Sequence, residues 1–91
     1  MIQKVFVIFD LNSKTAHSSL MLSKDEKSVK RNLIVYKGSL SKSIQAFPSD
    51  FAVFCLGEYD DEKLQLLPKD QADMCFSMKE VTDYVGPESN V

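Results

Sequence analysis

Two short runs of β-branched and aromatic residues constrain the fold of this chain most strongly. The first is KVFVIFD, in which Val5 to Phe9 are apolar at every position, and the second is Phe51 to Leu56. A strand that is apolar on both faces is typical of a sheet that is covered from both sides. Both runs are far too short to span a bilayer as helices. We therefore expect two buried strands, the first of them deep in the sheet, and no membrane association.

An acidic segment follows the second run and predicts a hairpin. Gly57 to Lys63 has the composition of a turn, and Leu64 to Leu67 continues as a short third strand that Pro68 ends. The turn carries four carboxylates: Glu58, Asp60, Asp61 and Glu62. Their spacing lacks the frame of a calcium loop, and a solvated turn would leave all four ionised alike instead of tuned as an acid and a base. We expect neither a metal site nor a catalytic pair there.

A helix is predicted to begin at Ser23. Ser23 and Glu26 have the spacing of a capping box, and Asp25 adds negative charge at the positive end of the helix dipole. Gly38 provides a natural stop.

The faces of this helix follow from steps of 100° per residue. Val29, Leu33 and Tyr36 then share one side and are assigned to the core. The alternative is a strand over NLIVY, because Ile34 and Val35 have high strand propensity and would fall on or beside the basic side of a helix.

Three further segments are less regular. Residues 16–22 are either a second strand or an extended loop, and residues 39–47 are either a short helix or an irregular connection. From Lys69 a terminal helix is predicted, with Met74, Met78 and Val81 on one side. With 91 residues the chain makes one domain, which we place at 1–85, followed by a flexible tail at 86–91. The predicted fold class is α+β: a small, mainly antiparallel sheet of three or four strands, an amphipathic helix packed on it, and a short C-terminal helix.

Charge is distributed unevenly along the chain. Residues 1–45 carry eight Lys or Arg against three Asp or Glu, whereas residues 46–91 carry three against ten. The basic residues of the predicted helix and the segment after it are the candidates for binding phosphates: Lys24, Lys27, Lys30, Arg31, Lys37 and Lys42. The alternative is a solvated helix face that the acidic half of the chain neutralises.

Other reactive residues indicate no chemistry. Cys55 and Cys75 lie in apolar surroundings without a CxxC pattern, which favours buried thiols over a disulfide and excludes a zinc site. His17 has no ligand at metal spacing and no serine or cysteine partner that the sequence can place beside it. A chain of this length does not enclose a deep cleft between two lobes, and its N-terminus has no signal-peptide pattern. We expect a cytosolic, non-enzymatic protein without a cofactor.

The segment PSDF, followed by an apolar run and LGEYDDE, resembles a viral family. The family is the small nonstructural protein of the microviruses, single-stranded DNA phages of the gokushovirus type. The matching stretches appear in order: KVFVIFD, the helix from Ser23, Pro48 to Phe51, and Leu56 to Asp61. The chain departs from the family in lacking a Pro-Phe-rich segment after the first strand and a Thr-Gly pair near the hairpin turn, and the terminal helix is outside the match.

This resemblance implies a phage accessory protein that is made in the infected bacterium, acts in the host cytoplasm and is absent from the virion. It also implies DNA binding during genome replication or packaging, which agrees with the basic helix, and it supplies no catalytic residue. Residues shared with the motif, namely Pro48, Asp50, Gly57 and Asp60, are interpreted as determinants of turns and strand ends. We expect single-stranded nucleic acid as the partner and a homodimer that doubles the phosphate contacts. The alternative is a module that binds a host or phage protein through the acidic hairpin and the sheet edge.

Overall fold

A computed structural model describes residues 1–85 of the chain. In chain order the strands are β1 (Ile2–Asp10), β2 (Thr15–Ala16), β3 (Met21–Ser23), β4 (Phe51–Asp60) and β5 (Gln65–Ser77). The α-helices are α1 (Glu26–Val35), α2 (Lys42–Ala46) and α3 (Met78–Thr82), and two 3-10 turns, η1 (Lys37–Ser39) and η2 (Pro48–Asp50), join them to their neighbours. The predicted tail at residues 86–91 lies outside the described residues.

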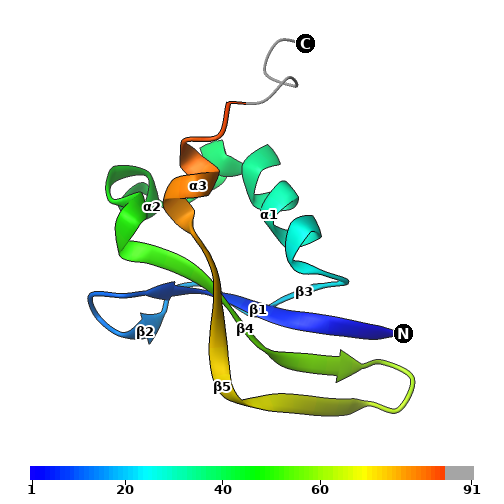
Figure 1. The fold of residues 1–91 in the computed structure, drawn as a ribbon. Coiled ribbons are helices and arrows are strands. Elements are labelled where there is room, and N and C mark those ends of the chain that lie inside the picture. The colour runs from blue at the N-terminus through cyan, green and yellow to red at the C-terminus, as the bar shows by residue number, and fades with distance from the viewer. Residues whose placement is uncertain (86–91) are drawn as a thin grey trace.

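The strands form one antiparallel sheet in the order β2-β1-β4-β5, with β3 also paired to β1. Figure 1 shows β1 and β4 side by side in the middle of this sheet, with β5 at one edge. β1 has hydrogen-bonded neighbours on both sides, and its side chains from Val5 to Ile8 are all buried. The predicted α+β fold, a mainly antiparallel sheet with a few helices, is confirmed.

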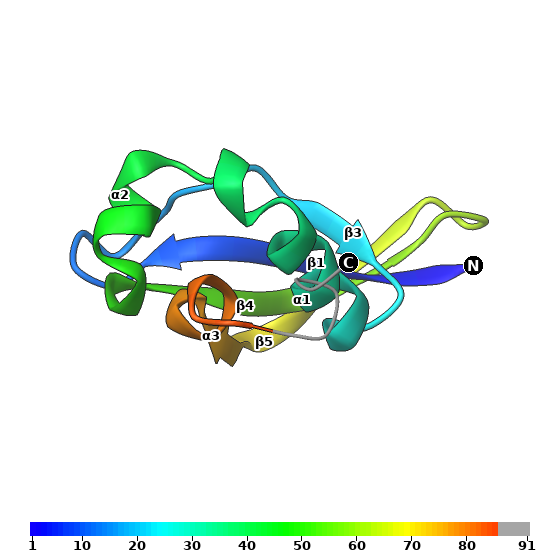
Figure 2. The same cartoon turned by 90° about the horizontal axis from the view of Figure 1, so that it is seen from above.

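All three helices lie on the same side of the sheet (Figures 1 and 2). The sheet contributes apolar side chains such as Phe6, Ile8 and Val53 to the core between the two layers. Each helix adds at least one buried residue to the same cluster, which contains Val29 of α1, Ile44 of α2, and Met78 and Val81 of α3. Burying these side chains away from water stabilises the two-layer fold.

The start of α1 differs from the prediction. Ser23 belongs to β3, where it pairs with Lys4 and is buried, so it does not cap the helix. The cap is Asp25, whose carboxylate accepts a hydrogen bond of 2.8 Å from the backbone N–H of Ser28. The segment SKDE offers two capping residues, and strand pairing with β1 removes the first of them.

The buried side of α1 is also rotated from the predicted one. Val29 is buried as predicted, and Leu33 and Ile34 pack against the core. The placement of Tyr36 in the core is wrong, since Tyr36 is 65 % exposed. Tyr36 is the C-cap of α1, with φ −104° and ψ 21°, so it has already left the helical path.

The hairpin is longer than predicted. β4 runs four residues beyond Leu56, to Asp60, and the turn covers only residues 61–64. A β-bulge at Leu56 makes this extension possible, since Val5 pairs with Gly57 while Phe6 pairs with Cys55. Gly57 has φ +153°, and a Cβ there would lie 2.4 Å from the carbonyl oxygen of Leu67. Only glycine tolerates this backbone conformation and this close approach, so the strand can continue through position 57.

The predicted terminal helix from Lys69 is wrong over most of its length. β5 continues past Pro68 to Ser77, and Met74 pairs with Phe54. Only Met78–Thr82 is helical, and it begins with a capping box in which Ser77 and Glu80 bond to each other's backbone. The helical spacing of the methionines was misleading, because the long ladder of β4 needs a partner strand there.

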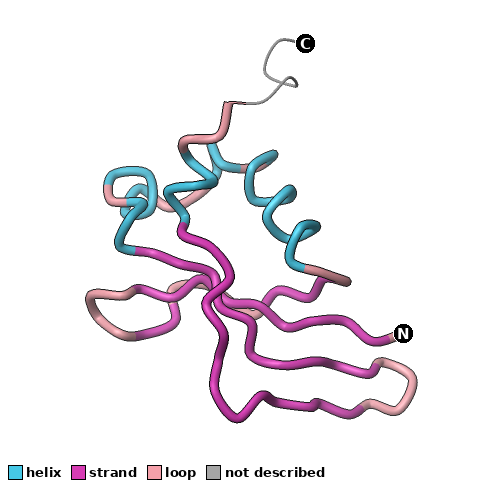
Figure 3. The backbone as a smooth tube through the Cα atoms, viewed as in Figure 1, coloured by secondary structure: helices cyan, strands magenta, loops and turns pink. Residues whose placement is uncertain are grey.

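The structure also decides between the two alternatives predicted for residues 16–22 and for residues 39–47, and Figure 3 shows these segments by colour. Within residues 16–22 the chain forms the end of β2 and the first two residues of β3, separated by a loop. Residues 39–47 contain the short helix α2, whose N-cap Ser41 accepts a hydrogen bond of 3.3 Å from the backbone N–H of Ile44. The short-helix alternative is therefore correct for most of the second segment.

Candidate nucleic-acid interface

Three of the six candidate basic residues form one exposed group at the start and on the outside of α1, called here the cationic surface: Lys24, Lys27 and Arg31. Their side chains form no ion pair or hydrogen bond with the part of the chain that the structure describes. The helix holds them on this side because Val29, Leu33 and Ile34 face the core. A cation without a carboxylate partner keeps its charge available for a phosphate.

Asp25 lies beside the cationic surface, and its carboxylate caps the N-terminus of α1. The pKa of its carboxyl is held below the usual value, first by the hydrogen bonds from Ser28 and then by the nearby Lys24 and Lys4. Its charge is therefore directed mainly at the N-terminal N–H groups of α1.

Lys30 is used differently from its neighbours on α1. Its Nζ lies 2.8 Å from Oε1 of Glu80 in α3 and 5.4 Å from the centroid of the Phe76 ring. The ion pair with Lys30 is the first cause that lowers the pKa of the Glu80 carboxyl. Lys30 thus joins α1 to α3, and its charge is already matched within the protein.

Lys37 and Lys42 are separated from the cationic surface by their contacts and position. Lys37 donates a hydrogen bond of 2.7 Å from its Nζ to the backbone carbonyl of Tyr84, which holds the chain after α3. Lys42 is the first residue of α2, which lies apart from α1 in the helix layer (Figure 2). The structure therefore brings together three of the six candidates.

Lys4 is a neighbour of this group that its position in the sequence does not reveal. Lys4 pairs with Ser23 across β1 and β3, which places it beside the residue that precedes Lys24. It also lines an open pocket of about 400 Å³ at the base of the β4–β5 hairpin, together with Glu58 and Lys69. Lys69 is itself paired with Asp73 at 3.1 Å. The available signal was the alternation of KVFVIFD, which puts Lys4 on the same face of the strand as Phe6.

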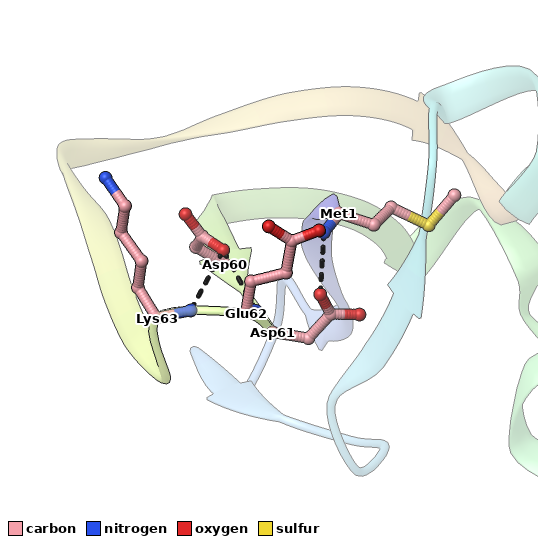
Figure 4. A network of polar contacts seen from close by, with 5 residues as sticks. All are labelled: Met1, Asp60, Asp61, Glu62 and Lys63. Carbon is pink, nitrogen blue, oxygen red and sulfur yellow. Dashed lines mark hydrogen bonds and ion pairs between the residues drawn. The ribbon is translucent and has the colours of Figure 1, made fainter.

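The acidic turn is held together by its own backbone and by Met1, which precedes β1 (Figure 4). Oδ1 of Asp60 accepts hydrogen bonds from the backbone N–H groups of Glu62 and Lys63, at 3.0 and 3.2 Å. The amino group of Met1 lies 2.7 Å from Asp61 and 3.2 Å from Glu62, and these contacts raise its pKa. Within residues 1–85 no group of three or more His, Cys, Asp or Glu residues is arranged to hold a metal ion.

His17 has a serine neighbour that the sequence could not place. Its Nε2 lies 2.9 Å from Oγ of Ser41, and its ring is tilted against Phe51 with 4.8 Å between centroids. Because Ser41 also caps α2, this contact fastens the loop after β2 to the helix layer. Both cysteines are free thiols, Cys55 buried and Cys75 half-buried, as favoured from the sequence.

Three of the four motif residues, Pro48, Asp50 and Asp60, lie at turns or strand ends, whereas Gly57 lies inside β4. Pro48 begins η2, and Asp50 ends it and accepts a hydrogen bond of 3.0 Å from the side chain of Asn12. Gly57 is at the bulge and Asp60 ends β4. Among the described residues, no helix is both long and apolar enough to cross a membrane.

Comparison with known proteins gives one finding that covers most of the chain. No curated protein and no solved structure matches. The model of a phage family, described as Phage ORF5 protein, matches residues 3–81, which include every strand except the first residue of β1, together with the cationic surface. The chain therefore belongs to this family of phage proteins.

Proposed function

We propose that this phage protein is a non-enzymatic accessory protein that binds single-stranded nucleic acid through its cationic surface. The observation that carries the proposal is that Lys24, Lys27 and Arg31 are exposed and have no ion pair within the described residues. Lys4 extends the group by one charge. The resemblance to the nonstructural protein of gokushovirus-type microviruses supports a role in genome replication or packaging, in the cytoplasm of the infected host and outside the virion.

Binding of this kind acts on the phosphate backbone and reads little sequence. Lys and Arg displace the counterions condensed on the strand, so affinity falls as salt rises. With three or four phosphate contacts, we expect the logarithm of the affinity to fall with the logarithm of the salt concentration with a slope of about −2 to −3 on single strands.

The position of Tyr36 supports single strands over duplexes. It is 65 % exposed at the end of α1, where an aromatic ring is free to stack on an unpaired base. Bases inside a duplex offer no face for such stacking, so a duplex would be bound through its phosphates alone.

Fluorescence anisotropy with a labelled oligothymidylate, measured over a series of salt concentrations, tests this function. The variant Lys27→Glu with Arg31→Glu should lose most of its affinity and flatten the salt slope. The matched control is Lys14→Glu with Lys63→Glu, which makes the same change in net charge at exposed turn positions away from α1. Equal losses in the two double variants would mean that only net charge matters and that the cationic surface is not a site.

A second function, binding of a host or phage protein, is favoured by the sheet edge. Within residues 1–85, β5 has a hydrogen-bonded partner on one side only, and residues 65–74 are all exposed. Such an edge accepts an additional strand from another protein. If the protein does not bind the oligonucleotide at low salt, protein binding through the edge of β5 becomes the better-supported function.

A further inference from the structure

The sheet has a second face, called here the outer face, that no helix of the described residues covers (Figures 1 and 2). Phe6 and Ile8 point to the helices, so the residues between and beside them in β1 point to the opposite side. The strand register adds the residues paired with them on β3, β4 and β5. The apolar centre of the outer face consists of Val5, Val7, Phe9, Leu22, Phe54 and Met74.

The paired positions of the outer face carry no charge. The charged residues paired in the sheet all alternate to the helix side: Lys4, Asp10, Glu58, Asp60 and Asp73. An antiparallel sheet with one face in water normally places its polar residues on that face and its apolar residues on the covered one. Here the face without helices is the uncharged one, which is the pattern of a covered surface.

The exposure of these side chains shows where a cover is missing. Val5 and Val7 are only 3 % and 4 % exposed, since they lie beside Leu22 and Phe54 in the ladder. Leu22 and Met74, toward the two edges of the face, are 50 % and 56 % exposed. The exposed apolar area therefore lies around a centre whose side chains are already buried.

The outer face is large enough for a weak interface. β1 has 9 residues, and the sheet order gives three spacings between four strands. At about 3.3 Å per residue and about 4.8 Å per strand spacing, the face measures roughly 30 by 15 Å. This projected area, roughly 450 Å², is about half of what each partner contributes to a standard interface, which is the size of a weak, transient one.

We propose that a second copy of this chain covers the outer face, with the two sheets packed back to back about a twofold axis. In such a pair each surface meets its own equivalent, so a charged surface would face like charge. The cationic surface of α1 and the acidic turn are unsuited to self-pairing for that reason, whereas the paired positions of the outer face carry no charge. The described chain ends beyond α3 on the helix side of the sheet, so the end of the described chain does not reach this face (Figure 1).

Sedimentation velocity over a concentration series tests the dimer without any nucleic acid, so its result is independent of the proposed binding function. The wild-type chain should pass from monomer to dimer as its concentration rises. Leu22→Lys and Met74→Lys should each raise the dissociation constant at least about tenfold, because each buries a charged amine in an apolar contact. Val35→Lys is the matched control, since Val35 is 68 % exposed on α1, and it should dimerise like wild type.

Leu22 and Met74 lie toward opposite edges of the outer face, so the two lysine variants distinguish a contact over the whole face from a contact at one edge. Loss of the dimer in Met74→Lys alone would assign the contact to the edge of β5 and overturn the back-to-back arrangement. A wild-type chain that stays monomeric at every concentration overturns the dimer altogether, including the case in which it instead binds lipid vesicles through this face. Circular dichroism confirms that each variant is folded, and Leu22→Thr, which places a polar residue of high strand propensity in β3, replaces any lysine variant that is not.

Discussion

Lys30 of α1 and Glu80 of α3 form an ion pair of 2.8 Å that joins two helices fifty residues apart in the sequence. The same carboxylate completes the capping box of α3, because its second oxygen accepts a hydrogen bond of 3.3 Å from the backbone N–H of Ser77. Glu80 therefore orients the start of α3 and the middle of α1 at once. This arrangement explains why one lysine in the basic stretch contributes to stability and not to an open cationic surface.

The pH dependence of stability should report this ion pair. The pKa of Glu80 is lowered in the folded state, so its contribution is present above its ordinary pKa of 4.5 and is lost as the pH falls through the lower, folded-state value. We expect Glu80→Gln to be less stable than wild type at pH 7, by a few degrees in Tm, and this difference in Tm to shrink as the pH falls below 4.5. Thermal unfolding measured from pH 7 to pH 3 checks this.

Other acid-sensitive groups are present in both wild type and Glu80→Gln, so their contributions cancel when the two proteins are compared. Asp10 and Asp25 also have lowered pKa values, since each carboxylate accepts backbone hydrogen bonds, so both proteins should lose stability in acid. Only the difference between them belongs to Glu80. A difference that stays constant from pH 7 to pH 3 would show that the charge of Glu80 is not what stabilises the helix pair.

Gly57, inside β4, and Gly38, after α1, should respond very differently to substitution by alanine. At Gly57 a Cβ would lie 2.4 Å from the carbonyl oxygen of Leu67, and φ is +153°. We expect Gly57→Ala to lower the free energy of unfolding by about 3 kcal/mol through strain and displaced backbone. Gly38 has nothing within 4 Å of an added Cβ, so Gly38→Ala should change it by no more than about 0.5 kcal/mol. Denaturant unfolding of the pair checks the bulge, and equal effects would contradict it.

The parts of the fold that the sequence predicts are those fixed by local pattern. β1 and β4 follow from continuous apolar runs, and α1 from its amphipathic spacing with a cap near its start. The errors occur where a distant partner decides. Met74 and Met78 have helical spacing, yet residues 69–77 form a strand because β4 offers an unpaired edge. The signal for the true start of α3 was local, the capping-box spacing of Ser77 and Glu80.

The candidate site shows the same division. The basic character of α1 is readable from the sequence, because Lys27 and Arg31 lie one turn apart on the helix and Lys24 directly precedes its cap. The capture of Lys30 by Glu80 was not readable, since no local rule relates residues fifty positions apart. The position of Lys4 beside the cationic surface was not readable either, because it depends on the register between β1 and β3. Strand register and long-range ion pairs are properties of the assembled fold.

Cys75 should be a poorly reactive thiol in the folded protein. Burial raises its pKa from 9.0 to about 11. Because only the thiolate reacts with alkylating reagents, the rate at pH 8 should be about 100-fold lower than in the unfolded chain. Alkylation by iodoacetamide, followed by peptide mass spectrometry, measures Cys75 and Cys55 separately. Rapid native modification of Cys75 would mean that β5 opens often enough to expose it.

Lys4 and Lys42 allow the composition of the nucleic-acid interface to be tested with a matched pair of neutral variants. Lys4 is next to the cationic surface through its pairing with Ser23, whereas Lys42 begins α2. If Lys4 contacts a phosphate, Lys4→Gln should reduce the magnitude of the salt slope on single strands by about 0.7, the value for one released contact. Lys42→Gln removes the same charge and should leave the slope unchanged. A reduced slope in Lys42→Gln with none in Lys4→Gln would move the interface to α2, in which case the exposed positions of α1 would not be the surface that follows the strand.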